Sequence, residues 1–131
     1  MRLAKNFRAA QLFEKHNNSE RSDRCMNYSQ ILEVASCTDP GMVRAHNEDS
    51  IASDPANGLV VLADGMGGYN AGEVASGMAT TVITTEIQQL LIKVQPFQID
   101  EETKVPVAGR MIRDQVLKAN TSIYQAAQSQ P

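Results

Sequence analysis

The chain has 131 residues, with 12 basic and 15 acidic side chains, a formal net charge of -3 and 42% hydrophobic residues. A net negative charge without interleaved basic and aromatic residues argues against a nucleic-acid-binding protein, and no apolar run is long enough to span a membrane. The two cysteines, Cys25 and Cys37, lack the spacing of a metal site. We predict that they are free thiols of a cytoplasmic protein.

The N-terminal segment differs in charge from the rest of the chain. Its first 24 residues hold six basic and three acidic side chains, a net of +3, which leaves six basic and twelve acidic side chains elsewhere, a net of -6. The segment lacks the apolar centre of a secretory signal, so we assign residues 1–27 to a flexible basic extension and 28–131 to a folded region. Two alternatives stay open: apolar residues between Leu3 and Phe13 could line a short basic helix, and translation could begin at Met26.

Two segments with strand character follow. Ile31–Cys37 is strand-like, and Val43–Ile51 encloses a cluster of polar residues that includes Arg44, Glu48 and Asp49. The residues after Ile51 contain the Pro and Asn-Gly signals of a hairpin turn. We therefore expect the strand before this turn to pair in the antiparallel sense with the strand after it.

The second strand of this hairpin is the apolar run Leu59–Ala63, whose composition is that of an interior strand. Asp64 follows it directly, and glycines at positions 65, 67 and 68 permit backbone angles that side chains would forbid. Asn70 is a favourable N-cap residue, and Glu73 stands three positions later, as in a capping box. Asp64 is therefore predicted to lie at a strand end, before a tight turn into a helix.

The hairpin suggests which residues lie opposite each other. If the first strand ends at Ser53, that residue pairs with Leu59, and five residues farther from the turn Glu48 pairs with Asp64. Two carboxylates would then project side by side from one face. A register shifted by one residue would exchange Glu48 for Asp49.

This pair of carboxylates suggests a cation site. Like charges on neighbouring strands repel unless a cation lies between them, and Mg²⁺ or Mn²⁺ prefers oxygen ligands of this type. Arg44 lies four residues before Glu48 and so shares its face in a strand, whereas Asp49 points to the other face in this register. Because a guanidinium group binds a pair of phosphate oxygens well, the face also suggests phosphate recognition.

Two amphipathic helices complete the predicted elements. Apolar residues recur at helical spacing from Glu73 to Pro96, and again after the polar loop Gln98–Lys104. We expect both helices to pack antiparallel on the sheet with these stripes in the core. The stripe of the first helix consists of Ala75, Ala79, Val82, Ile83, Ile87, Leu90 and Leu91. The stripe of the second consists of Val105, Ala108, Ile112, Val116, Ala119, Ile123 and Ala126.

Three runs of residues, in their order and separation, resemble a known family. They read TDPGMVRAHNEDS at residues 38–50, ADGMGG at residues 63–68 and AGEVAS at residues 71–76. Together they resemble the opening of a bacterial metal-dependent protein serine/threonine phosphatase of the PPM, or type 2C, family. The resemblance implies an α+β fold, a partial four-layer α-β-β-α sandwich with antiparallel sheets, of which this chain carries the N-terminal half.

The resemblance also implies an activity and its residues. The family removes phosphate from phosphoserine and phosphothreonine with two Mn²⁺ or Mg²⁺ ions, which lower the pKa of a shared water and neutralise charge at phosphorus. Asp64 matches the aspartate that bridges both metals, and Gly65 matches the residue whose backbone carbonyl binds one of them. Glu48 matches a metal ligand, direct or through water, and Asp49 a supporting carboxylate. Arg44 matches the phosphate-binding arginine.

The extent of the match leaves three interpretations open. The family's second half carries further aspartates that complete the metal site, and this sequence stops just before the strand that opens that half. The chain is then a protein serine/threonine phosphatase, a non-catalytic remnant or interaction module, or one half of a split phosphatase. Its expected partners are phosphoserine or phosphothreonine proteins, with a serine/threonine kinase or a complementing chain. We expect the chain alone to be slow or inactive.

Overall fold

The computed structural model describes residues 27–43, 46–67 and 70–129. The predicted extension of residues 1–27 lies almost wholly outside them, so its flexibility and its boundary stay predictions. The elements in chain order are a 3-10 turn η1 (Tyr28–Gln30), strand β1 (Ser50–Asp54), a 3-10 turn η2 (Pro55–Asn57), strand β2 (Leu59–Ala63), helix α1 (Ala71–Leu91) and helix α2 (Val107–Ser129). Among the described residues, no helix is long and apolar enough to cross a membrane.

Strands β1 and β2 form an antiparallel hairpin, as predicted, but the predicted register was wrong by one residue. Asp54, not Ser53, pairs with Leu59. The turn explains the difference, because the carboxylate of Asp54 accepts hydrogen bonds from the backbone N–H of Asn57 at 3.2 Å and from its side-chain amide at 2.7 Å. Gly58 then closes the turn with a φ of 66°, which glycine adopts without steric cost. The loop is therefore one residue shorter than expected.

The extent of the strands also differs from the prediction. β2 has the predicted bounds, whereas β1 begins at Ser50 and not at Val43. Ile31–Cys37 is not a strand: the described sheet contains β1 and β2 only. The amides of Ile31 and Leu32 donate instead to the carbonyl of Tyr28 at 2.9 and 2.8 Å. A strand-like sequence forms a strand only where a partner strand accepts its hydrogen bonds.

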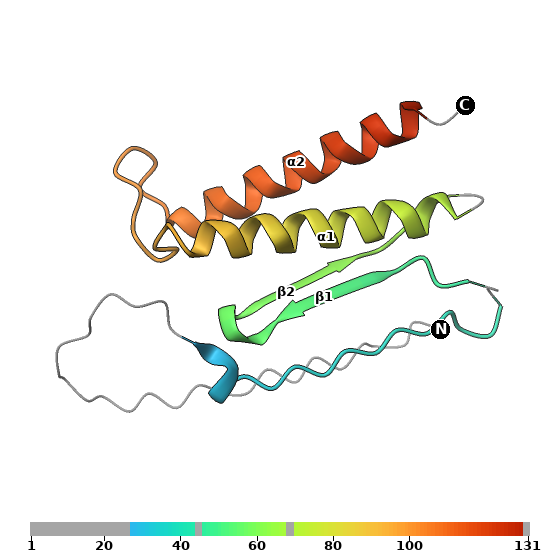
Figure 1. The fold of residues 1–131 in the computed structure, drawn as a ribbon, viewed down its shortest axis with the longest axis horizontal. Helices are drawn as coiled ribbons and strands as arrows, with labels where there is room; N and C mark the ends of the chain where they lie inside the picture. Colours follow the sequence, from blue (N-terminus) through green and yellow to red (C-terminus); the bar gives the residue numbers. More distant parts are fainter. Residues whose placement is uncertain (1–26, 44–45, 68–69, 130–131) are drawn as a thin grey trace.

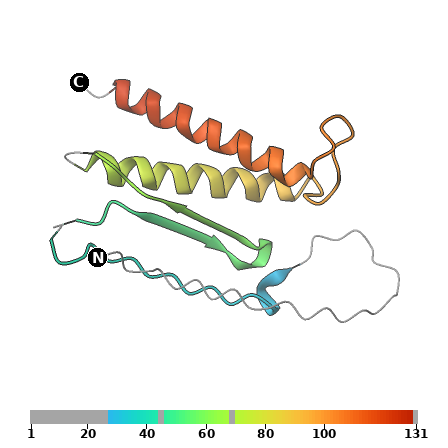
Figure 2. The ribbon, with the colours of Figure 1, turned by 180° about the vertical axis from the view of Figure 1, so that it is seen from behind.

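The fold is α+β, as predicted, with one helix on the sheet and the second helix on the first. α1 covers one face of the hairpin, and α2 runs antiparallel to α1 on the side away from the sheet (Figures 1 and 2). The expectation that both helices pack on the sheet was therefore wrong for α2. Among the described residues, the most deeply buried apolar side chains are Ile87 of α1 and Val107, Met111 and Ala119 of α2.

Apolar side chains remain exposed on the outer faces of these layers. Val60 and Leu62 of β2 are each 40% exposed on the sheet face turned away from α1. Ile112 and Val116 of α2 are 51% and 47% exposed although both belong to the predicted core stripe. That part of the stripe was wrong because, among the described elements, α2 packs mainly against α1, so only a narrow arc of its surface is covered.

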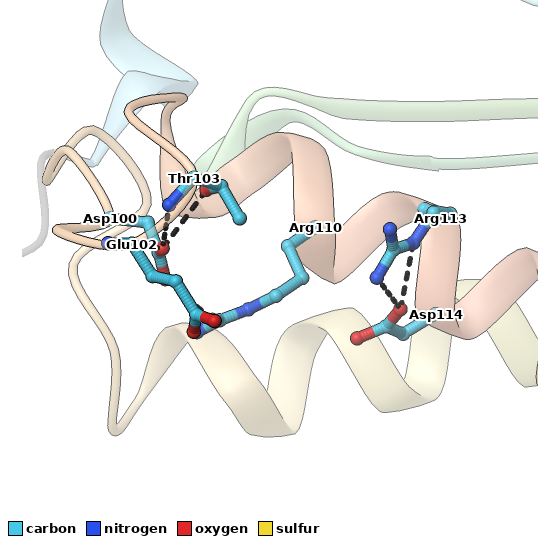
Figure 3. Close-up of polar contacts among 6 residues, drawn as sticks. All are labelled: Asp100, Glu102, Thr103, Arg110, Arg113 and Asp114. Atoms are coloured by element: carbon cyan, nitrogen blue, oxygen red, sulfur yellow. Dashed lines mark hydrogen bonds and ion pairs between the residues drawn. The ribbon is translucent and has the colours of Figure 1, made fainter.

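The connection between the helices is fastened by Asp100 (Figure 3). Its Oδ1 accepts hydrogen bonds from the backbone N–H of Glu102 at 3.2 Å and from the backbone N–H and Oγ1 of Thr103 at 2.8 and 2.9 Å. Its Oδ2 accepts one from Nη1 of Arg110 at 2.5 Å, which ties the loop to α2. These donors, the Thr103 backbone first, hold the pKa of Asp100 below its ordinary value. The cluster therefore stabilises the loop and the start of α2.

Candidate functional site

The structure describes four of the five predicted site residues. Glu48, Asp49, Asp64 and Gly65 lie within the described ranges, and Arg44 lies outside them. The predicted phosphate-binding role of Arg44 therefore stays a prediction. The four described residues lie in two segments, the chain that leads into β1 and the turn that leaves β2.

These two segments meet the first turn of α1 with almost no space between the backbones. Gly65 is buried, and a Cβ atom built on it would collide with the carbonyl oxygens of Glu48 and Gly72. A Cβ atom built on Gly72 would lie 2.9 Å from Cδ and 3.0 Å from Oε2 of Glu48, and 3.0 Å from the backbone nitrogen of Met66. Glycine is needed at both positions because the three segments approach too closely for any side chain.

This reason for glycine, the close approach of other backbone segments, differs from the reason that the sequence suggested. We attributed the glycines of the turn to unusual backbone angles, yet neither Gly65 nor Gly67 has a positive φ. The predicted site does not include Gly72. Its position just inside a predicted helix, where glycine is unfavourable, was the signal that another group approaches it closely.

Helix α1 begins where predicted, but the capping box does not form. Asn70 has a φ of 64° and a ψ of 5°, and its side chain makes no capping hydrogen bond. N-cap side chains reach the first amides from extended backbone angles, whereas Asn70 adopts the left-handed conformation that asparagine tolerates. Glu73 lies within this first turn, and the carboxyl group of Glu48 also lies beside it, against Gly72. The helix dipole favours a negative charge at that place.

Ser76 connects α1 to the chain before β1. Its side chain is buried, with the residue 3% exposed, and its Oγ donates to the carbonyl oxygen of Glu48 at 2.5 Å. The carbonyl oxygen of Glu73, within the helix, lies farther from the same hydroxyl, at 3.1 Å. The shorter bond joins residues 28 positions apart in the sequence. Ser76 therefore links helix α1 to the main chain of residue 48.

Two further polar contacts continue this connection along the hairpin. The hydroxyl oxygens of Thr80 and Ser50 lie 2.8 Å apart, and Nε2 of Gln88 donates to Oδ2 of Asp54 at 2.6 Å. The bonds from Asn57 and Gln88 hold the pKa of Asp54 below its ordinary value, with Asn57 the larger cause. Polar residues at four-residue spacing in α1 are the sequence signal for these contacts, which the prediction from the apolar stripe does not include.

The carboxylates of the site do not converge in the way that the predicted register required. Extended one pair beyond the end of β1, the observed register places Asp49, not Glu48, opposite Asp64. Asp64 is exposed, and Asp49 is half-buried with its backbone N–H bonded to Oδ1 of Asn47 at 3.0 Å. Glu48 turns toward α1 instead. This is the slipped alternative that the sequence had left open.

The described residues therefore do not form a complete metal site by themselves. Carboxylate oxygens are ligands of the type that Mg²⁺ and Mn²⁺ prefer. However, no three His, Cys, Asp or Glu side chains within the described ranges lie together as a group that could hold a metal ion. The metal-ligand roles of Glu48, Asp49, Asp64 and Gly65 stay predictions.

Comparison with known proteins identifies the relatives of this chain. It is 47% identical over 53 residues to the serine/threonine protein phosphatase PstP of Mycobacterium tuberculosis, a match that covers 40% of this chain and 10% of PstP. It is 44% identical over 50 residues to the serine/threonine phosphatase stp of Listeria innocua, covering 36% of this chain and 20% of the relative. The resemblance to bacterial serine/threonine phosphatases is confirmed.

A third relative extends the comparison to another genus. The protein phosphatase PhpP of Streptococcus pneumoniae is 40% identical over 53 residues, which covers 38% of this chain and 22% of PhpP. No model of a protein family matches the chain. The matched segments thus span between 10% and 22% of the length of these curated relatives.

Proposed function

We propose that this chain is the N-terminal part of a metal-dependent phosphatase that removes phosphate from phosphoserine and phosphothreonine proteins. The observation that carries the proposal is the identity of 40% to 47% with bacterial protein phosphatases over 50 to 53 residues. The geometry supports it, because the segments that carry the predicted ligands are packed tightly against the start of α1. Such close backbone packing holds side chains in place, as a catalytic centre requires.

In this proposal the chain contributes oxygen ligands to a Mn²⁺ or Mg²⁺ centre and a cation for the substrate. Asp64, Glu48 and Asp49 provide carboxylates, Gly65 provides its backbone carbonyl, and Arg44 binds the phosphate group. Because the described residues bring no three such side chains together, further ligands are needed. They would come from elsewhere in the complete phosphatase or from a second chain. Phosphorylated proteins are the proposed substrates.

The test is Mn²⁺-dependent hydrolysis of a phosphothreonine peptide by the wild-type chain, alone and mixed with the separately purified remainder of a related phosphatase domain. Asp64→Asn is the test variant. Asp114→Asn is the matched control, since Asp114 lies on α2 and pairs there with Arg113 at 3.0 Å. We expect a rate that requires Mn²⁺, that falls at least about tenfold in Asp64→Asn, and that Asp114→Asn leaves unchanged.

The outcomes separate the three interpretations. Activity of the chain alone would favour a complete enzyme, and activity only after mixing would favour the split phosphatase. If wild type and Asp64→Asn gave the same rate in both arrangements, the phosphatase proposal would be refuted and a non-catalytic module would be favoured.

A further inference from the structure

We infer that Ser76 is a positioning residue, whose hydroxyl holds the main chain of Glu48 and thereby keeps the Glu48 carboxylate against Gly72 at the start of α1. The importance of this carboxylate for catalysis rests on the proposed function. The positioning itself is a statement about the folded chain and is tested separately.

The first step concerns the hydrogen bond. A serine hydroxyl has one proton to donate, and two carbonyl oxygens compete for that of Ser76. The oxygen of Glu48 lies at 2.5 Å and that of Glu73 at 3.1 Å, so the contact between segments is the shorter one. Residue 48 also precedes the first pair of the hairpin, so within the described part of the chain no strand pairing holds its carbonyl group. The carbonyl oxygen of Glu48 is therefore bonded by a side chain of α1 and not by the backbone of β2.

The second step concerns the space around Glu48. Its carbonyl oxygen lies where a side chain on Gly65 would stand, and its carboxyl group lies where a side chain on Gly72 would stand. The carbonyl group and the carboxyl group of Glu48 are thus both packed against backbone atoms, and Ser76 donates a hydrogen bond to the carbonyl oxygen. Because interiors packed this closely do not deform continuously, a shift of the Glu48 main chain must move its carboxylate.

The third step concerns the register between α1 and the hairpin. Four residues of a helix rise about 6 Å, and two residues of a strand rise about 6.7 Å, so every fourth residue of α1 can meet every second residue of the neighbouring chain. The pairs Gln88 with Asp54 and Thr80 with Ser50 follow this match. Ser76 continues it one step beyond β1, to residue 48. This match places Glu48, and not Asp49, on the face of the chain that contacts α1.

The experiment compares the wild-type chain with Ser76→Ala by NMR. The readouts are the nuclear Overhauser effect between the side-chain protons of Glu48 and the α protons of Gly72, and the amide exchange rates of Glu48 and Asp49. In Ser76→Ala we expect that effect to disappear and those rates to rise about tenfold, the change that corresponds to one hydrogen bond. Both readouts report the position of residue 48, which a purely helix-stabilising role of Ser76 would leave unchanged.

Two further variants make the result decisive. Ser122→Ala is the matched control, because Oγ of Ser122 donates at 3.0 Å to a carbonyl oxygen of its own helix, that of Lys118. It should change neither readout. Ser76→Cys fills nearly the same space with a weaker donor and gives the same test if Ser76→Ala does not fold. A folded variant at position 76 that keeps the Glu48–Gly72 effect and wild-type exchange rates would overturn the inference.

Titration of the same samples with Mn²⁺ alone, followed by water proton relaxation, separates this inference from the proposed function. Weaker Mn²⁺ binding in Ser76→Ala, together with loss of the Glu48–Gly72 effect, supports both. Loss of that effect without Mn²⁺ binding by the wild-type chain supports the positioning role and counts against a metal site on this chain. A retained effect overturns the positioning role whatever Mn²⁺ does.

Discussion

Replacement of two threonines of α1 by valine is expected to change stability in opposite directions. Thr80 and Thr84 lie one helical turn apart. The hydroxyl of Thr80 lies 2.8 Å from that of Ser50, whereas the buried hydroxyl oxygen of Thr84 has no hydrogen-bond partner among the residues that the structure describes. At four-residue spacing Thr84 falls opposite Ala52, whose side chain offers no polar atom. Valine keeps the branched shape of threonine and removes only the hydroxyl.

The expected magnitudes follow from these surroundings. Thr80→Val removes the contact with Ser50 and the contacts of Thr80 Oγ1 with the carbonyl oxygens of Ser76 and Gly77 at 3.1 Å. It leaves the half-buried hydroxyl of Ser50 without its Thr80 partner, which should lower the free energy of unfolding by about 1–2 kcal/mol. Thr84→Val removes a buried polar group to which no described residue supplies a hydrogen bond, and it should raise the free energy of unfolding by about 1 kcal/mol. The two variants should therefore differ by about 2–3 kcal/mol, or roughly 10 °C in Tm.

Urea unfolding followed by far-UV circular dichroism measures this difference. Thr85→Val is the control, because Thr85 is exposed on the same helix and reports the effect of valine on the helix alone. After subtraction of that effect, the midpoints of Thr80→Val and Thr84→Val should lie on opposite sides of the wild type at an unchanged m-value. Shifts in the same direction would refute the polar register between α1 and the hairpin.

Two more predictions concern the turn after β2 and the loop between the helices. Gly65→Ala should destabilise the fold by roughly 3 kcal/mol because its Cβ meets two carbonyl oxygens. Gly77→Ala should stabilise α1 by about 1 kcal/mol, because a Cβ there would meet no described atom within 4 Å apart from its chain neighbours and the backbone of its own helix. Equal urea midpoints of the two variants would contradict this prediction. Hydrogen bonds from Thr103 hold the pKa of Asp100 below 3.8 in the folded state, so its carboxylate stabilises the fold above that pH and loses this effect as the pH falls through the folded pKa. The stability difference between wild type and Asp100→Asn should therefore shrink on acidification, and a constant difference would be inconsistent with this assignment.

Local features of the sequence determined most of the secondary structure and the relationship to phosphatases. The apolar run Leu59–Ala63 has the bounds of β2, and the hairpin and both helices are present as predicted, although α2 begins at Val107 and the predicted stripe at Val105. Such elements follow from interactions between residues close in sequence, which a pattern of a few residues records. The motifs around Glu48 and Asp64 likewise indicated the relatives that the comparisons identified.

The arrangement of the site was decided only by tertiary structure. The one-residue change of register depends on how Asp54 and Gly58 close the turn, and the orientation of Glu48 depends on Ser76 and Gly72, more than 20 positions away. The uncovered part of the α2 stripe depends on which partner that helix packs against. The sequence could not specify these features because hydrogen bonds and steric exclusion between distant segments act only once those segments meet.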